Sequence, residues 1–191
     1  MKTRDIDIRT SLHYMLQKEH ENESDTIILD ELGLCQGDAR IDVAVVNGAI
    51  NGYEIKSESD TLERLPRQRE AYNRVFDTVT VLTASRFIEG LEDIIPEWWG
   101  VTRAEMKDDG KVEFLTYRQP QQNPNIDPLA LAQLLWRDEA ITILKERGLH
   151  KGLLSKPRQI LWNALAQNLE LRDLQDAVRK TLKARKRWRD H

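Results

Sequence analysis

The sequence predicts an α/β protein with a mixed β-sheet core flanked by helices and a C-terminal helical extension. Two alternating runs rich in β-branched residues lie close together, at residues 40–46 and 49–57. A helix-patterned stretch and a further β-branched run at 77–83 follow, which is the order of a strand–helix–strand unit with parallel strands. From residue 129 onward only helical periodicity remains.

The first elements lead into a hairpin. Residues 6–20 carry apolar side chains at helical spacing, residues 26–29 form a short β-prone run, and residues 35–38 read as a turn. Because side chains alternate along a strand, residues 40–46 divide into two faces. One face holds Ile41, Val43 and Val45, and the other holds Arg40, Asp42 and Ala44.

The second strand of the hairpin carries two charges on one face. Asn47-Gly48 is typical of a two-residue hairpin turn. In the strand that follows, Glu54 and Lys56 share a face with Gly52, so the hairpin brings Asp42, Glu54 and Lys56 to one side of a sheet.

The remaining elements are read from periodicity and from turn residues. We expect helices at 59–76 (with Pro66 near the start), 87–95, 128–147, 156–168 and 171–188, and strands at 77–83, 96–101 and 111–117. This divides the chain into a core at 1–118, a Pro-, Gln- and Asn-rich linker at 119–128, and a basic helical extension at 129–191 with the outline of a helix-turn-helix.

Bulk properties narrow the class of protein. No apolar run approaches the ~18 residues of a membrane helix, and the N-terminus has no apolar signal region. The single cysteine, Cys35, excludes an internal disulfide and a thiolate zinc site, so we expect a cytoplasmic protein.

The charge is unevenly distributed along the chain. Residues 127–191 hold 14 Lys and Arg against 8 Asp and Glu (+6), whereas residues 1–126 hold 15 against 24 (−9). This asymmetry indicates nucleic-acid contact, although a solvated helix surface gives the same pattern.

Three charged residues among β-branched residues indicate a functional site, because buried charge is costly unless it is paired or binds a metal. Mg²⁺ (or Mn²⁺) prefers oxygen ligands and is commonly held by one or two carboxylates, as in phosphodiester hydrolysis. Asp42 and Glu54 are the candidate carboxylates, and the carbonyl of Ile55 is a candidate third ligand. Lys56 can orient the attacking water or stabilise developing charge. The alternative is an ordinary surface ion pair.

Asp42 followed by Glu54-Ile55-Lys56 resembles the PD-(D/E)XK nuclease superfamily, which has the restriction-endonuclease-like fold. Gln68 and Tyr72 resemble the Q-x-x-x-Y motif of its RecB-like members. Within it, the segments around Glu31-Leu32, 40–44, 53–57 and 60–68 look like the sce7726 family of bacterial and phage proteins. The Pro of the motif is absent, since Ile41 precedes Asp42.

This resemblance implies a metal-dependent nuclease, with DNA as the favoured substrate. The implied catalytic residues are Glu31, Asp42, Glu54, Lys56, Gln68 and Tyr72. The implied metal ligands are Asp42, Glu54, Ile55 and Glu31. An additional acid usually comes from the first helix. Glu19 is therefore the second candidate for that acid, behind Glu31. Gln68 can instead cap a strand, and Tyr72 can simply be core.

Phosphate contacts are predicted at basic side chains. These are Arg40, Arg64, Arg179, Lys180, Lys183, Arg185, Lys186 and Arg187. Arg40 can instead pair with Asp42 or Glu31. The alternative functions are a non-catalytic DNA-binding or adaptor protein of the same fold, and a phage or defence accessory protein whose C-terminal helices bind a protein partner.

Overall fold

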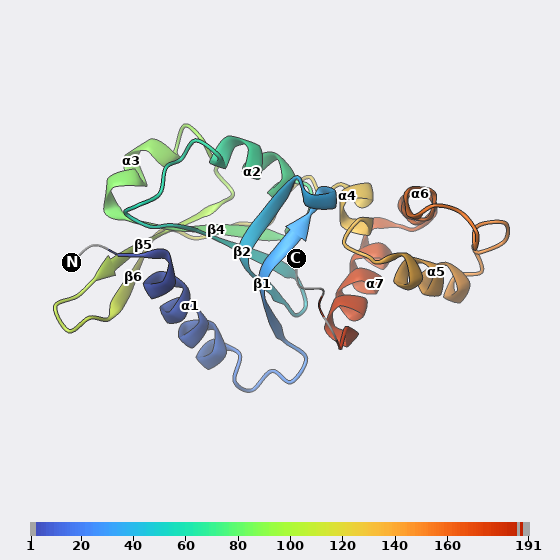
Figure 1. Ribbon diagram of the computed structural model, residues 1–191, viewed down its shortest axis with the longest axis horizontal. Coiled ribbons are helices and arrows are strands. Elements are labelled where there is room, and N and C mark those ends of the chain that lie inside the picture. The colour runs from blue at the N-terminus through green and yellow to red at the C-terminus, as the bar shows by residue number, and fades with distance from the viewer. Residues whose placement is uncertain (1–2, 187, 189–191) are drawn as a thin grey trace.

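A single six-stranded mixed sheet forms the centre of the protein, in a computed structural model that describes residues 3–186 and 188 (Figure 1). The strands lie in sequence order; β1, β2 and β3 are antiparallel, β3, β4 and β5 parallel, and β5 and β6 antiparallel. They are β1 Ile27–Leu34, β2 Ala39–Val46, β3 Ile50–Lys56, β4 Thr78–Thr83, β5 Gly100–Met106 and β6 Val112–Arg118. The predicted mixed α/β class is confirmed, as is the parallel pairing of β3 with β4.

Helices cover both faces of the sheet and form a separate group beyond the β1–β2 end. They are α1 Asp5–Glu19, α2 Leu65–Tyr72, α3 Ile88–Leu91, α4 Pro128–Ala132, α5 Arg137–Glu146, α6 Arg158–Asn168 and α7 Leu171–Ala184, with 3₁₀ turns η1 Cys35–Gly37 and η2 Ser85–Phe87. Figure 1 shows α1 on one face, α2 and α3 on the other, and α4–α7 as a cluster beside the β1–β2 hairpin. No helix in the described ranges has the length and apolar character needed to cross a membrane.

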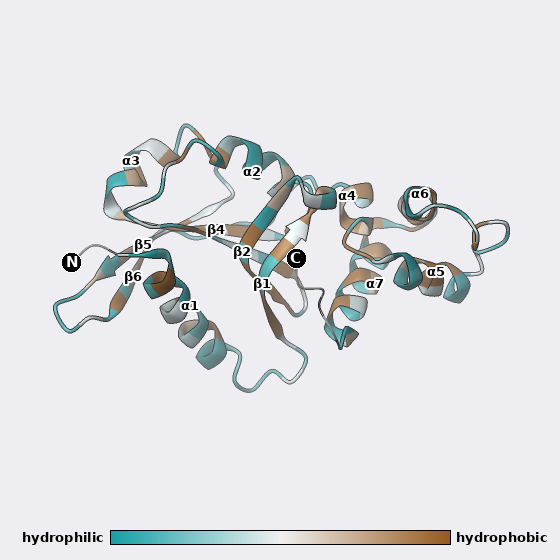
Figure 2. Cartoon of the chain, viewed as in Figure 1, coloured by the Kyte–Doolittle hydropathy of each residue, from teal (hydrophilic) through white to brown (hydrophobic). Residues whose placement is uncertain are grey.

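The apolar core has two parts. The smaller lies under α1, where Ile8, Leu12 and Leu16 pack on Val43 and Val45. The larger lies on the opposite face and runs without interruption from the sheet through α2 into α4–α7. Figure 2 shows the corresponding apolar residues along the strands and within the C-terminal helix cluster.

The segment predicted as a linker is bonded to the connection between α2 and β4. Asn123 is buried; its N–H donates to the Asp77 carbonyl at 2.8 Å, and its side chain donates to the carbonyls of Asn73 and Phe76. The segment contains no strand, and its only helical residue is Pro128, which begins α4. Its hydrogen bonds place α4 against the larger core.

The alternation along β1 and β2 changes phase at Glu31 and Asp42, which corrects one prediction. Ile41 packs in the larger core, whereas Val43 and Val45 pack under α1, so the three do not share a face. The reason is local backbone geometry. Glu31 adopts a left-handed conformation (φ 55°). The pairing of β1 with β2 skips Glu31 and Asp42, although the residues on either side of each of them are paired.

Other boundaries also differ from the predictions. β1 runs on to Leu34, and the hairpin loop has three residues, 47–49, because the Asn47 side chain accepts the Ala49 N–H. The helix expected at 59–76 is restricted to α2, which begins beside Pro66 after a turn in which Asp60 accepts the Ser57 N–H. The helix expected at 87–95 is reduced to η2 and the four residues of α3.

The C-terminal helices are also shorter than predicted. The expected helix at 128–147 is two helices, because Glu139 accepts the Trp136 N–H at the start of α5 and the Trp162 ring donates to the Leu135 carbonyl. The last helix ends at Ala184 rather than at residue 188, since Arg185 leaves the helix to bind Glu139.

Candidate active site

Glu54 is a buried carboxylate held by three side chains. It is 1% exposed, and its Oε1 accepts from Lys56 Nζ at 2.5 Å and from Gln68 Nε2 at 2.8 Å. Its Oε2 lies 2.6 Å from the Tyr72 hydroxyl. Lys56 is bound to Gln68 Oε1 as well, at 3.2 Å. The structure therefore brings together Glu54, Lys56, Gln68 and Tyr72, four of the site residues named from the sequence.

The sheet and α2 set this geometry. Glu54 and Lys56 point to the same face of β3 as Gly52, where the Phe76 ring leaves no free space for a larger side chain. Tyr72 is fully buried on α2, with its ring stacked on Trp99 at 5.9 Å between centroids. Burial, and then the adjacent Glu54, raise the pKa of the Tyr72 hydroxyl, so it remains a proton donor.

Asp42 lies at the neighbouring position of β2 and is bound on both oxygens. Its Oδ2 accepts the Ile55 N–H at 2.7 Å, and its Oδ1 accepts from Arg9 Nη2 at 2.9 Å. Burial, and then the charge of Glu54, raise the pKa of Asp42 to about 7; the Ile55 N–H and Arg9 oppose this rise. The Asp42 and Glu54 carboxylates are therefore close enough for the charge of one to disfavour that of the other.

Arg9 was not predicted from the sequence, and it organises the acidic side chains. Besides Asp42, it contacts Glu31 Oε1 at 3.0 Å and Asp5 Oδ1 at 3.3 Å. Its Nη1 lies 3.5 Å from Asp30. The only sequence signal was the Asp5–Arg9 spacing of four residues on one helix.

The two candidates for the additional acid have different positions. Glu31 lines the same pocket as Asp42 and Glu54, but its oxygens are bound to Arg9 and, at 2.7 Å, to Arg40. Glu19 lies near Tyr53, which packs on the opposite face of β3; burial, and then the charge of Glu19, raise the pKa of the Tyr53 hydroxyl. The acid from α1 that lines the pocket is Asp5, and its charge also raises the pKa of Asp42.

These oxygens suit a hard divalent cation. Asp42 and Glu54 supply two carboxylates, and Ile55 lines the pocket although its side chain packs under α1, so its main chain faces the site. Mg²⁺ needs no more than one or two carboxylates, because it keeps several waters. In the described part of the chain, no three His, Cys, Asp or Glu side chains are grouped closely enough to hold an ion by themselves.

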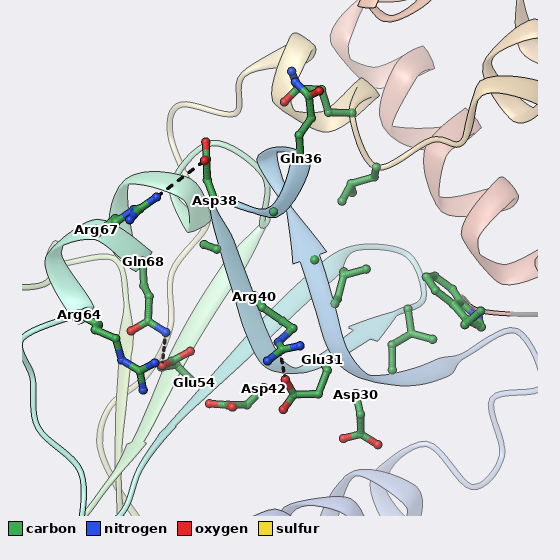
Figure 3. Close-up of a pocket in the computed structure, with 18 of the residues that line it drawn as sticks. Asp30, Glu31, Gln36, Asp38, Arg40, Asp42, Glu54, Arg64, Arg67 and Gln68 are labelled. Carbon is green, nitrogen blue, oxygen red and sulfur yellow. Dashed lines mark hydrogen bonds and ion pairs between the residues drawn. The ribbon is translucent and has the colours of Figure 1, made fainter. Parts of the chain in front are cut away.

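The site opens into a groove of about 1170 Å³ between the sheet and the C-terminal helices. Figure 3 shows Glu54, Gln68 and Arg64 at one end, with Glu31, Arg40 and Asp42 beside them. Arg64 is exposed and points from the start of α2 toward Glu54. Arg40 is 55% exposed and pairs with Glu31, one of the two partners considered for it from the sequence.

The basic residues of the C-terminal tail have mixed environments. Arg179 pairs with Asp176 and Lys183 with Asp25, whereas Arg185 is 4% exposed and pairs with Glu139 at 2.7 Å. Arg179 Nη1 also lies 3.9 Å from Asp77, so all three arginine and lysine side chains link separate parts of the fold. Lys180 and Lys186 are exposed, and the predicted contact at Arg187 lies outside the described residues.

Comparison with known proteins shows that the chain is similar to a phage protein. The profile of the family described as bacteriophage P4 protein cII matches residues 3–190. Protein cII of Enterobacteria phage P4 is 24% identical over 168 residues, which cover 85% of this chain and 60% of that protein. The chain therefore spans 60% of the length of this relative. A solved structure of a protein of unknown function from Silicibacter pomeroyi is similar with a TM-score of 0.41 and 17% identity, covering 73% of this chain and 88% of that one.

Proposed function

The chain belongs to the bacteriophage P4 protein cII family, and we propose that it is a metal-dependent nuclease that hydrolyses phosphodiester bonds in DNA. One observation carries the proposal. Buried Glu54 is bound by Lys56, Gln68 and Tyr72 while Asp42 faces it from the next strand. A titratable cluster of this kind in a groove is a candidate for catalysis.

The proposed fold is restriction-endonuclease-like. A helix, three antiparallel strands, a helix and a parallel fourth strand follow one another, with the acids on the second and third strands. This is the order expected from the PD-(D/E)XK resemblance. DNA is favoured over RNA by analogy with that superfamily.

Each side chain has a role in this proposal. Asp42 and Glu54, with the main chain of Ile55, would hold Mg²⁺ or Mn²⁺. The ion, when bound, supplies an activated water and neutralises charge on the phosphate. Lys56 is fixed between Glu54 and Gln68 and presents its ammonium group to the attacking water or the phosphate. Tyr72 and Gln68 orient Glu54. Arg40 and Arg64 contact phosphate, while Glu31 orients Arg9 and Arg40.

A second candidate function is a non-catalytic nucleic-acid-binding or adaptor protein. The observation in its favour is that both oxygens of Glu54 and both oxygens of Asp42 already have protein partners. Such a network is stable without an ion. Calorimetric titration with Mn²⁺ separates the two: the nuclease binds the ion and loses this binding on Asp42→Asn, whereas the adaptor does not bind it.

The nuclease proposal is tested with end-labelled single- and double-stranded DNA in Mg²⁺ or Mn²⁺. Wild type should cleave, and Lys56→Ala should be slower by about 10²-fold or more. Lys151→Ala, at an exposed lysine outside the groove, is the control and should match wild type. Equal rates for wild type and Lys56→Ala on every substrate and with either metal would overturn the proposal.

A further inference from the structure

The groove continues past the acidic site to a second end built by the C-terminal helices. There its walls include Trp136, Arg137, Arg158 and Trp162. On the opposite side lie α2 and η1, with Arg67 and Gln36. One continuous surface thus connects the proposed catalytic carboxylates to a set of arginines and indole rings.

Charge is unevenly distributed along this groove. Its acids are concentrated around Asp42, whereas exposed guanidinium groups lie along the walls. Arg67 is 77% exposed and is only 3.8 Å from Asp38, which is itself 69% exposed, so this ion pair is weak. Arg137 is 43% exposed. These cations remain accessible to an anionic ligand in the groove.

Arg158 is the most informative of them. It is exposed, its guanidinium lies 5.2 Å from the centre of the Trp162 ring, and its Nη2 is 3.4 Å from Gln36 Oε1. Gln36 belongs to η1, in the turn between β1 and β2. Arg158 therefore reaches from α6 across to the hairpin that carries Asp42.

The aromatic end is held in place by Arg185. This guanidinium lies 4.1 Å from the centre of the Trp136 ring and 4.3 Å from that of Trp188, and it is anchored by Glu139. Aromatic rings fixed beside exposed arginines are the two components that single-strand-binding proteins combine. Trp162 is only 2% exposed and packs beneath Arg158, whereas Trp136 and Trp188 are partly exposed, so stacking on these two rings and phosphate contact are available at the same end.

We infer that this groove binds a single DNA strand that runs from the carboxylate site to Arg158 and the partly exposed rings of Trp136 and Trp188. The inference rests on the proposed function for the chemistry at the acidic end. The volume, about 1170 Å³, is somewhat larger than the ~300–1,000 Å³ of sites that hold one drug-sized ligand. That space accepts a short stretch of one strand, whereas a duplex would remain outside it.

The test is binding, measured separately from cleavage. Fluorescence anisotropy of a labelled single-stranded oligonucleotide about 12 nucleotides long is recorded in Ca²⁺ and in EDTA at several salt concentrations, and gels verify that the DNA stays intact. The variants are Arg158→Gln and Arg67→Gln. Arg172→Gln is the matched control, because Arg172 is an exposed arginine on the next helix, α7, and lies outside the groove.

Wild type should bind the single strand at least several-fold more tightly than a duplex of the same length. Each groove variant should weaken binding several-fold and reduce the slope of log K against log salt by about 0.7, the value for one lost contact to a single strand. The control should leave both unchanged. Equal slopes for Arg158→Gln and wild type, or tighter binding to duplex, would overturn the inference.

Cleavage and binding can fail independently. If wild type cleaves DNA in Mg²⁺ while the groove variants bind like wild type, the groove assignment is wrong and the nuclease proposal stands. If no DNA is cleaved under any condition while the groove variants lose binding as expected, the groove assignment stands and the nuclease proposal is wrong.

Discussion

The Arg9 guanidinium binds both the side chain and the main chain of Asp42. Nη2 lies 2.9 Å from Oδ1, and Nη1 lies 2.8 Å from the carbonyl oxygen. The same guanidinium reaches Glu31 at 3.0 Å. One cation from α1 therefore compensates the acids of β1 and β2, next to the oxygens proposed to hold a metal ion.

Replacing Arg9 with Gln should destabilise the protein by about 1–3 kcal/mol, because it leaves partly buried carboxylates without a counter-ion. Added Mg²⁺ should recover part of this loss, since it supplies positive charge at Asp42. Urea unfolding with and without Mg²⁺ measures both effects. Arg4→Gln, at the residue that precedes the same helix, is the control, because the Arg4 side chain is 73% exposed. An Arg9→Gln protein as stable as wild type would contradict this role.

Asp42→Asn should change how stability depends on pH. With the pKa of Asp42 at about 7 in the folded protein and near 3.9 when unfolded, the folded state holds a proton that the unfolded chain releases. Stability should therefore fall as pH rises through this window, by up to about 4 kcal/mol. The variant lacks this loss, so its stability relative to wild type should increase from about pH 4 to about pH 8 in metal-free buffer.

The measurement for Asp42 is chemical unfolding at several pH values in EDTA. Asp93→Asn, at an exposed aspartate, should follow the wild-type curve. Adding Mg²⁺ at the highest pH should raise the stability of wild type and not that of Asp42→Asn. Parallel curves for wild type and Asp42→Asn would show that the Asp42 carboxyl has an ordinary pKa.

Tyr72→Phe isolates the hydroxyl that touches Glu54. The ring contacts with Trp99 and Phe76 are retained, while the Arg40 carbonyl and Glu54 Oε2 lose a partner at 2.7 and 2.6 Å. We expect a loss of about 1–3 kcal/mol in unfolding free energy. Calorimetry should also show Mn²⁺ binding weakened several-fold. Tyr14→Phe, at a 70% exposed tyrosine, should change neither quantity.

Arg185→Gln separates a structural arginine from a phosphate contact. Its side chain is 4% exposed and pairs with Glu139. Breaking a buried pair leaves an unpaired charge, so thermal unfolding should show a loss of about 3–5 kcal/mol. The salt slope of single-strand binding should stay at the wild-type value under conditions where the variant is folded. A reduced slope with unchanged stability would instead support the phosphate contact predicted from the sequence.

Much of the fold and of the site could be predicted from local patterns. Alternation placed Glu54 and Lys56 on one face of β3, and the spacing of Gln68 and Tyr72 placed both on one face of the next helix. These predictions succeeded because side-chain direction in a strand or helix depends only on sequence separation. The length of the α2 helix was not predictable in this way, since a turn closed by Asp60 replaces its first residues.

The C-terminal basic residues show the limit of composition. Charge counting treated Arg179, Lys183 and Arg185 alike as surface cations. The structure gives each an acidic partner in another part of the fold. Such partners are far apart in sequence, for example Lys183 and Asp25, so no local pattern indicates them.

The sequence alone determined the mixed α/β class, the hairpin, and the convergence of Asp42, Glu54 and Lys56, because these follow from strand periodicity and turn residues. Only the tertiary structure decided that α1 delivers Arg9 and Asp5 rather than Glu19 to the acids, and that α6 brings Arg158 to the same groove. Those contacts depend on how helices dock on the sheet. Docking is set by how the two apolar cores pack, and this packing cannot be predicted from any short stretch of sequence.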